Sequence, residues 1–319
     1  MNDIAQVEAA DFDGLPAWRI VSTSGATALI AERGATLISW QPAPGKEVIA
    51  GYKTADELVN HVSYRSAVLA PWCGRIAEGS YSFGGERYEL GTGEDAMHGF
   101  ATDVDFYVES KGNTLTLRHD FEAREGYPWG FTLTATFSLD SGADDEHLSV
   151  SFTAKNTGEV PIPLSLGWHP YVQLPGVSSI SNLSLTIPAR TKILTDCKQI
   201  PLPGEAAYAG INTPYVTDYL GSKQMDTTFR GLVPDDEGVV TSVVSSPATG
   251  SSVSITQEPS DAPAIHVFTA DGLARDSRSA IALEPYSHLA DAYNRADSKA
   301  SIALAPGEQR YMTATLTFS

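Results

Sequence analysis

The sequence contains few cysteines and no long apolar segment. Its 319 residues include only Cys73 and Cys197, which lie far apart and lack the spacing of a metal site. A disulfide scaffold is therefore not expected, and a reducing compartment fits this composition. No run of about 18 apolar residues occurs, so we expect no transmembrane helix. The N-terminal segment MNDIAQVEAADFDG is acidic and lacks the apolar core of a signal peptide, which favours a cytoplasmic location.

Positive charge is also scarce. The chain has 21 Lys and Arg residues against 39 Asp and Glu residues, a formal net charge of −18. Such a field repels nucleic acid and anionic membrane surfaces, so neither is an expected partner. It also disfavours a polyanionic substrate, although a local cluster of arginines would override this effect.

Helical periodicity is rare, whereas alternation with a period of two runs through most of the chain. Thr- and Val-rich alternation of this kind predicts half-buried strands. It is clearest in five segments: TLTLRHDF (114–121), FTLTATFSL (131–139), HLSVSFTAKN (147–156), LSLTIP (183–188) and MTATLTF (312–318). Turn signals such as NTGE and FGGE separate the strands.

Helices are expected in two places at most. TADELVN (54–60) predicts a short helix with Thr54 as its N-cap, and DAYNRAD (291–297) predicts a turn or a second short helix. No linker, composition shift or fixed-period repeat divides the chain. Many antiparallel strands without such a boundary predict one all-β domain over residues 1–319, a large sandwich or barrel.

Two titratable residues stand directly before prolines. His169 precedes Pro170 in SLGWHPYVQL, and Glu284 precedes Pro285 in AIALEPYSHL. Proline cannot donate to a sheet ladder and keeps the preceding residue extended, so both residues are predicted at strand ends. A glutamate there is costly to bury unless it is paired or used. Because strand ends and their loops carry the sites of all-β enzymes, both are candidate site residues.

Two further candidates lie in turns. Arg75 follows a Pro-Trp-Cys-Gly turn, and its guanidinium can donate a fork of hydrogen bonds to ligand oxygens. His98 precedes Gly99, which permits a tight turn of the backbone. Taken alone, Arg75 would be better interpreted as a surface arginine, and His98 as a loop histidine without a role.

The four segments around Arg75, His98, His169 and Glu284, in this order along the chain, resemble motifs of the aldose 1-epimerase (galactose mutarotase) family. GRIAEGSY is similar to its Asn-Arg-(Ile/Val)-Ala and Gly-x-(Tyr/Phe) motif, and MHGF to its Leu-His-Gly motif. WHPYVQL is similar to its Asn-His-x-Tyr-Phe-x-Leu motif, and EPYSHLADAYN to its Glu-Pro and Asp-Ala-x-Asn motif. The resemblance spans nearly the whole chain and indicates a divergent, bacterial-type branch.

The resemblance implies a large antiparallel β-supersandwich that interconverts the α and β anomers of a free aldose. It implies no metal or cofactor and a monosaccharide as the partner, and we expect a monomer or a weak homodimer. Carried over residue by residue, the catalytic base falls on Glu284 and the general acid on His169. The sugar-binding residues fall on Arg75, on His98 and, within the short motif QMDTTFRGL, on Asp226.

The sequence departs from the family pattern in three places. Gly74 replaces an asparagine, Trp168 a polar residue and Ala290 a proline. We expect Trp168 to bind substrate by narrowing the pocket or stacking on a sugar face. His266, in AIHVFTADG, is a candidate to line the pocket, but the interpretation we favour is a satisfied sheet histidine.

Three other functions remain open at this level. A hexose-6-phosphate epimerase on the same fold would need a basic cluster for the phosphate, and the sequence shows only isolated arginines. A carbohydrate-binding protein without catalysis would have no need of both Glu284 and His169. A metal site formed by His98, His169 and Glu284 is the third, although no closely spaced His-x-His pair occurs.

Overall fold

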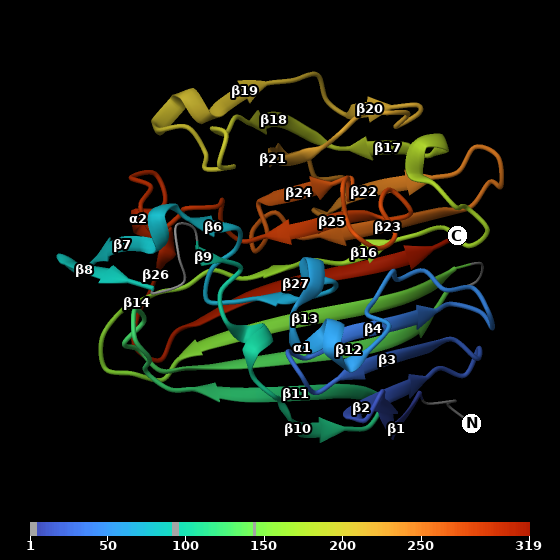
Figure 1. Ribbon diagram of the computed structural model, residues 1–319, viewed down its shortest axis with the longest axis horizontal. Coiled ribbons are helices and arrows are strands. Elements are labelled where there is room, and N and C mark those ends of the chain that lie inside the picture. The colour runs from blue at the N-terminus through green and yellow to red at the C-terminus, as the bar shows by residue number, and fades with distance from the viewer. Residues whose placement is uncertain (1–4, 91–95, 143–144) are drawn as a thin grey trace.

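Antiparallel strands form nearly all of the regular structure, which confirms the all-β prediction (Figure 1). The computed structural model describes residues 5–90, 96–142 and 145–319. One continuous hydrophobic core joins the large sheets and includes Trp40, Phe137 and Trp168. No helix in the described part of the chain combines the length and the apolar character that crossing a membrane requires.

The longest strands belong to a nine-stranded sheet. Its order is β10 (Tyr107–Lys111), β11 (Thr114–Phe121), β12 (Phe131–Ser141), β13 (Glu146–Asn156), β27 (Gln309–Phe318), β23 (Ser252–Gln257), β22 (Val240–Ser245), β17 (Ser184–Ile187) and β20 (Tyr215–Thr217). The five alternating segments predicted from the sequence are β11, β12, β13, β17 and β27, with bounds that differ by a few residues at most. Alternation predicts them well because each strand buries one face and exposes the other.

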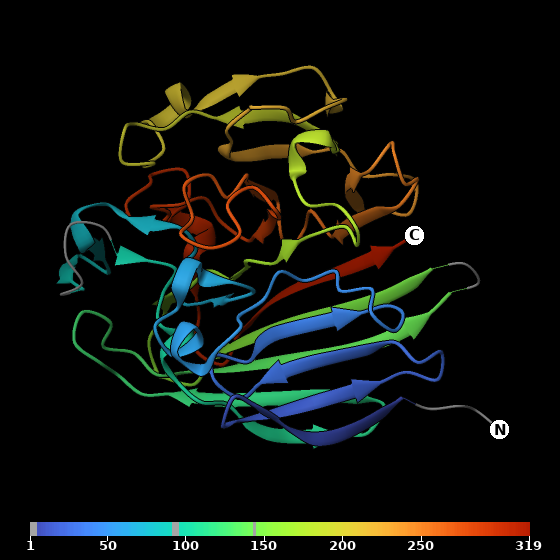
Figure 2. The ribbon, with the colours of Figure 1, turned by 45° about the vertical axis from the view of Figure 1, so that its right-hand side comes forward.

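An N-terminal sheet covers part of this one. It contains β1 (Gln6–Phe12), β2 (Leu15–Val21), β3 (Thr27–Ala31) and β4 (Thr36–Gln41). Figure 2 shows these blue strands in front of the green strands β11–β13. Side chains of both sheets, among them Ile30, Leu37 and Phe152, belong to the same core cluster.

A second large sheet has eight strands and carries most of the polar residues considered below. Seven run in the order β19 (Tyr208–Gly210), β18 (Ala189–Ile193), β21 (Asp226–Leu232), β24 (Ala264–Phe268), β25 (Ile281–Tyr286), β15 (Gly167–Trp168) and β5 (Val68–Leu69). The eighth strand, β16 (Tyr171–Val172), pairs with β25.

Short elements complete the structure. Within the described residues, three two-stranded ribbons pair β14 (Ile162–Pro163) with β26 (Ala303–Leu304), β6 (Arg75–Ile76) with β9 (Ala96–Met97), and β7 (Ser80–Phe83) with β8 (Glu86–Glu89). The helix predicted at 54–60 is α1 (Ala55–Val59), and the Thr54 side chain accepts the Glu57 N–H as its N-cap. DAYNRAD forms turns, and the second helix, α2 (Lys299–Ile302), follows it.

Candidate active site

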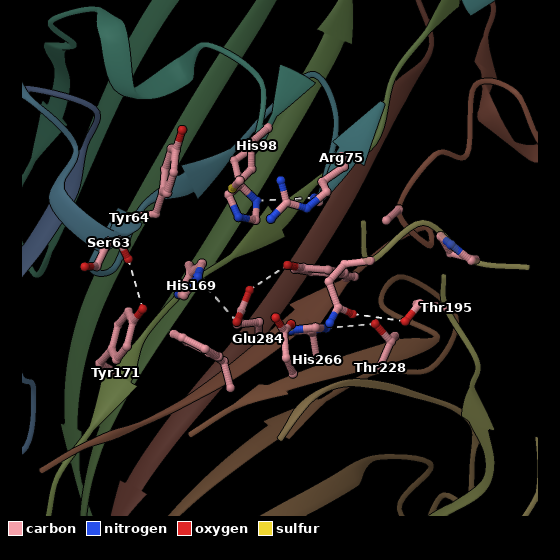
Figure 3. Close-up of a pocket in the computed structure, with 18 of the residues that line it drawn as sticks. Ser63, Tyr64, Arg75, His98, His169, Tyr171, Thr195, Thr228, His266 and Glu284 are labelled. Atoms are coloured by element: carbon pink, nitrogen blue, oxygen red, sulfur yellow. Dashed lines mark hydrogen bonds and ion pairs between the residues drawn. The ribbon is translucent and has the colours of Figure 1, made fainter. Parts of the chain in front are cut away.

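A cavity of about 300 Å³ opens beside β25, where the eight-stranded sheet meets the β6–β9 ribbon (Figure 3). Its walls bring together five of the six residues proposed from the sequence: Arg75, His98, His169, Asp226 and Glu284. The other polar or aromatic residues in its lining are Ser63, Tyr64, Tyr171, Thr195, Gln199, Thr228, His266, Phe268 and Tyr286. Among the described residues, no group of three or more His, Cys, Asp or Glu side chains is arranged to hold a metal ion.

Glu284 is buried in the middle of the sheet, with 1% of its side chain exposed. It lies within β25 and not at a strand end as predicted, because the strand continues through Pro285, opposite Ile265, to Tyr286. Tyr286 projects from the same face two residues later and donates a 2.6 Å hydrogen bond to Oε2 of Glu284. Burial raises the pKa of Glu284 from 4.5 to about 7, against the lowering effects of His266 and of this hydrogen bond.

His169 lies between β15 and β16, at the strand end predicted from Pro170. Its backbone is fixed on both sides, because its N–H donates to Ala67 O and its carbonyl accepts from Ser66 N–H. Its ring stacks on Tyr171 with a centroid separation of 5.0 Å. Such fixation holds the imidazole in one orientation.

The ring of His169 meets the carboxylate of Glu284. Nε2 of His169 lies 3.4 Å from Oε1 of Glu284, and neither this oxygen nor His169 Nδ1 has a hydrogen-bond partner among the described residues. Burial, followed by the charge of His266, lowers the pKa of His169 to about 3. The usual order of the two pKa values is therefore reversed, and between these values the pair holds one proton.

His98 and Arg75 are brought side by side by the β6–β9 ribbon, in which Arg75 is paired with Met97. His98 has a left-handed backbone (φ 62°), and Gly99 follows at φ 73°, where a Cβ would lie 2.0 Å from Ala70 O. The tight turn predicted here is thus confirmed, and only glycine fits the second position.

The protonation state of His98 follows from its contacts. The N–H of Gly74 donates to His98 Nδ1 over 3.2 Å, so the ring hydrogen is on Nε2. Burial, then the charges of His169, His266 and Arg75, lower the pKa of His98 well below its usual range. His98 is therefore a neutral hydrogen-bond donor.

Asp226 begins β21 and is held by His266. Its Oδ1 lies 2.9 Å from His266 Nε2, and 43% of its side chain is exposed. The hydroxyl of Thr228 lies 2.8 Å from the other ring nitrogen, Nδ1. The expectation that His266 is mainly a sheet histidine was incomplete, because its ring lines the cavity as well as pairing within the sheet.

Trp168 does not line this cavity, and the prediction that it contacts the sugar conflicts with its position. Its side chain is fully buried in the main core, 6.4 Å from the ring of Phe152 in β13. Successive residues of an extended chain point to opposite sides, so Trp168 faces the core when His169 faces the cavity. The tryptophan replaces a polar residue of the family pattern at a position that serves packing here.

The other two departures, Gly74 and Ala290, face each other across one corner of the cavity. Gly74 has φ +64°, and a Cβ built on it would lie 2.7 Å from Cβ of Ala290. The two small residues therefore belong to one local arrangement, in which a side chain at 74 has no room unless residue 290 moves.

Sequence reasoning missed Tyr286 and gave too little weight to His266. The signal for Tyr286 was present in EPY, because residues two apart on a strand share a face. No local pattern marks His266, since its role depends on cross-strand pairing with Glu284 and Thr228.

Comparison of the sequence with known proteins identifies a matching family and several relatives. The family model described as aldose 1-epimerase matches residues 16–317. An uncharacterized protein of Escherichia coli strain K12, YihR, is 29% identical over 140 residues, which are 42% of this chain and 44% of that protein. Galactose mutarotase of Sus scrofa is 29% identical over 170 residues, which are 50% of this chain and 47% of that enzyme. The chain thus spans about half the length of these curated relatives.

A solved structure extends the likeness of the fold to most of the chain. The crystal structure of an aldose epimerase homologue from C. elegans superposes with a TM-score of 0.80 and 18% identity, over 93% of this chain and 96% of that one. At this identity the superposition establishes the galactose mutarotase-like fold.

Proposed function

The chain belongs to the aldose 1-epimerase family, and we propose that it interconverts the α and β anomers of a free, neutral aldose. One observation carries the proposal: the buried pair of Glu284 and His169, whose side chains lie 3.4 Å apart in the wall of a sugar-sized cavity. The anomeric hydroxyl and the ring oxygen of a pyranose are bonded to the same carbon. A base and an acid that serve both oxygens must therefore lie close together, as this pair does.

In the proposed reaction, Glu284 takes the proton of the anomeric hydroxyl while His169 delivers a proton to the ring oxygen. The ring opens to the aldehyde, the C1–C2 bond rotates, and the reverse transfers close the ring with the opposite configuration. Each positioned proton-transfer group contributes about 10²–10⁴-fold. No electron transfer is involved, and the proton count of the pair is the same before and after turnover.

The remaining polar residues are proposed to hold the sugar. His98 donates a hydrogen bond from Nε2 to a sugar oxygen, and the guanidinium N–H groups of Arg75 donate to sugar oxygens as well. Asp226 accepts a hydrogen bond from a sugar hydroxyl through its exposed oxygen. Holding the reactant in this way lowers the barrier further, because the reacting atoms are kept near their transition-state positions.

Charge in the cavity favours a neutral substrate over a hexose 6-phosphate. Arg75 is the only Lys or Arg among the described residues that line it, and Asp226 and Glu284 line it too. A phosphate group would meet one guanidinium beside the carboxyl groups of Asp226 and Glu284, with His266 already bound to Asp226, whereas the hydroxyls of a free sugar find both donors and acceptors.

The test is a polarimetric or NMR exchange screen of freshly dissolved glucose, galactose, xylose and arabinose, with glucose 6-phosphate and galactose 6-phosphate in parallel. We expect faster equilibration of at least one free sugar, unchanged by exhaustive chelation and lost in Glu284→Gln. Acceleration of the phosphates alone would replace the proposed substrate. Sugar binding without acceleration of any anomeric exchange would instead indicate a binding protein.

A further inference from the structure

His266 occupies the centre of a polar cluster on three neighbouring strands. In the register of the sheet, His266 of β24 lies directly opposite Glu284 of β25 and opposite Thr228 of β21. Residues opposite each other in an antiparallel pair have Cβ atoms about 5 Å apart. Asp226 projects from the same face of β21 as Thr228. The imidazole therefore lies between one carboxylate that it binds and a second, buried carboxylate.

The contacts of His266 suit a ring that carries two protons. Nε2 lies 2.9 Å from a carboxylate oxygen of Asp226, so this nitrogen carries a hydrogen. Nδ1 lies 2.8 Å from the hydroxyl of Thr228, which can donate to a bare nitrogen or accept from a protonated one. His266 can thus gain its second proton without losing a partner.

The other two histidines of the cavity lack this arrangement. Nδ1 of His98 already accepts the Gly74 N–H, so a second proton there would break that bond. Nδ1 of His169 is buried without a hydrogen-bond partner among the described residues. Of the three rings, only His266 has a partner ready for each proton of an imidazolium.

A second contact links His266 to Glu284. The ring of His266 stacks on the ring of Tyr286 at a centroid distance of 5.8 Å and an interplanar angle of 10°. Tyr286 in turn donates its hydroxyl to Oε2 of Glu284. His266 therefore contributes both to the charge near this carboxylate and to the position of its hydrogen-bond donor.

We propose that His266 is a positioning residue that, as an imidazolium bound to Asp226, stabilises the ionised form of Glu284 and holds Tyr286 against it. This inference rests on the proposed function, since it assigns Glu284 the role of base. The other titratable and charged groups that line the cavity with His266 and Glu284 are Asp226 on β21, Tyr286 on β25, Tyr171 on β16, His169 just before β16, Arg75 on β6, His98 just after β9, and Tyr64.

The directions of the pKa values agree with this arrangement. Burial alone would lower the pKa of His266, but the charge of Glu284 and the bond to Asp226 outweigh burial and raise it. Reciprocally, His266 is the largest influence that opposes the burial-driven rise in the pKa of Glu284.

The first test compares the pH–rate profiles of wild type and His266→Gln, with His288→Gln as the matched control. His288 is half-buried outside the cavity and hydrogen-bonded to Ser287 and Ser301, so its profile should match wild type. Loss of the His266 charge raises the pKa values of both Glu284 and His169. Both limbs should therefore move to higher pH, by on the order of one pH unit. Unmoved limbs with a raised KM would overturn the inference and leave His266 as a sugar contact only.

The second test observes the protonation of His266 directly in the unmodified protein and is then compared with the result of the exchange screen. In protein labelled with ¹⁵N-histidine, NMR at pH 6.5 should show two protons on the ring of His266 and one each on His98 and His169. A singly protonated His266 in an enzyme that accelerates mutarotation would overturn this inference alone. A doubly protonated His266 in a protein that accelerates no anomeric exchange would support the electrostatic arrangement and reject the proposed function.

Discussion

Side chains alternate between two faces in both large sheets, but the kinds of residue that the two sheets bury differ. Between Leu133 and Leu139 in β12, each inward position is apolar and each position between is Thr or Ser. All six residues of β25 are buried, and one of them is Glu284. The first sheet places polar groups where water reaches them, whereas the second holds a carboxylate where only protein groups, or a ligand, can satisfy it. The comparison distinguishes residues whose burial stabilises the fold, such as the apolar positions of β12, from residues whose burial costs folding free energy, such as Glu284.

The largest effect is expected for Glu284→Gln. This change keeps the size of the side chain and removes the base, so kcat should fall by about 10²–10⁴-fold while sugar binding persists. The matched control is Glu47→Gln, because Glu47 accepts the backbone N–H groups of Trp40 and Ile49 outside the cavity. The control should lose stability and keep kcat. A similar loss of kcat in both variants would contradict the separation of roles.

The same variant should gain stability at alkaline pH. Because folding raises the pKa of Glu284 from 4.5 to about 7, its contribution to stability is full below pH 4.5 and is lost as pH rises through 7. Replacing it with a neutral amide should therefore raise the free energy of unfolding at pH 8 by up to roughly 3 kcal/mol. Urea unfolding of both proteins at pH 4 and pH 8 measures this, and an equal difference at the two pH values would show that Glu284 is not the buried acid described here.

His169→Asn should reduce kcat by a similar factor and change the shape of the pH profile. In wild type, activity requires one proton on the pair, so we expect an alkaline limb near pH 7, where burial has moved the pKa of Glu284. Without the imidazole, the residual rate requires only an ionised Glu284 and should rise with pH through this range. Persistence of the alkaline limb in the variant would assign the acid to another group, with His98 the first to examine.

Prediction from sequence was more complete for the nine-stranded sheet, which contains all five alternating segments, than for the eight-stranded sheet, which carries the candidate site. β11 was predicted to the residue because alternation is a local property, and the short helix at 54–60 followed from its N-cap. Glu284 and His169 were found because a proline follows each and because the motifs resemble a family. His266 was undervalued, since its importance comes from register with strands distant in the chain. Trp168 was predicted to contact the sugar but lies in the core, because a residue that departs from a motif can occupy either face of its strand.

Trp168→Ala should reduce stability without changing the order of preferred sugars. Removing a fully buried tryptophan from the main core costs about 3–5 kcal/mol, from the lost apolar contact and the cavity left behind. The measurements are urea unfolding and the sugar ranking from the exchange screen. If the ranking changes as strongly as stability, the side chain must reach the sugar after all, and the boundary drawn between Trp168 and His169 would be wrong.

The smallest effect is expected at the corner formed by Gly74 and Ala290, where the cavity meets the scaffold. Gly74→Ala places a Cβ 2.7 Å from Cβ of Ala290 at a residue with φ +64°. The left-handed backbone should cost about 1–2 kcal/mol, and relief of the clash requires residue 290 to move at the cavity wall. Because Gly74 also donates to His98 Nδ1, KM should rise severalfold while kcat changes little.

A double-mutant cycle separates the two causes of this effect. Ala290→Gly removes the opposing methyl group, so the double variant should recover the KM of wild type and keep the cost of the left-handed backbone in its free energy of unfolding. The coupling between the two sites would then appear in KM, as expected for residues in contact. Additive effects on KM would mean that position 74 reaches the sugar only through His98. In that case the corner would belong with the scaffold, and its two small residues would not shape the cavity.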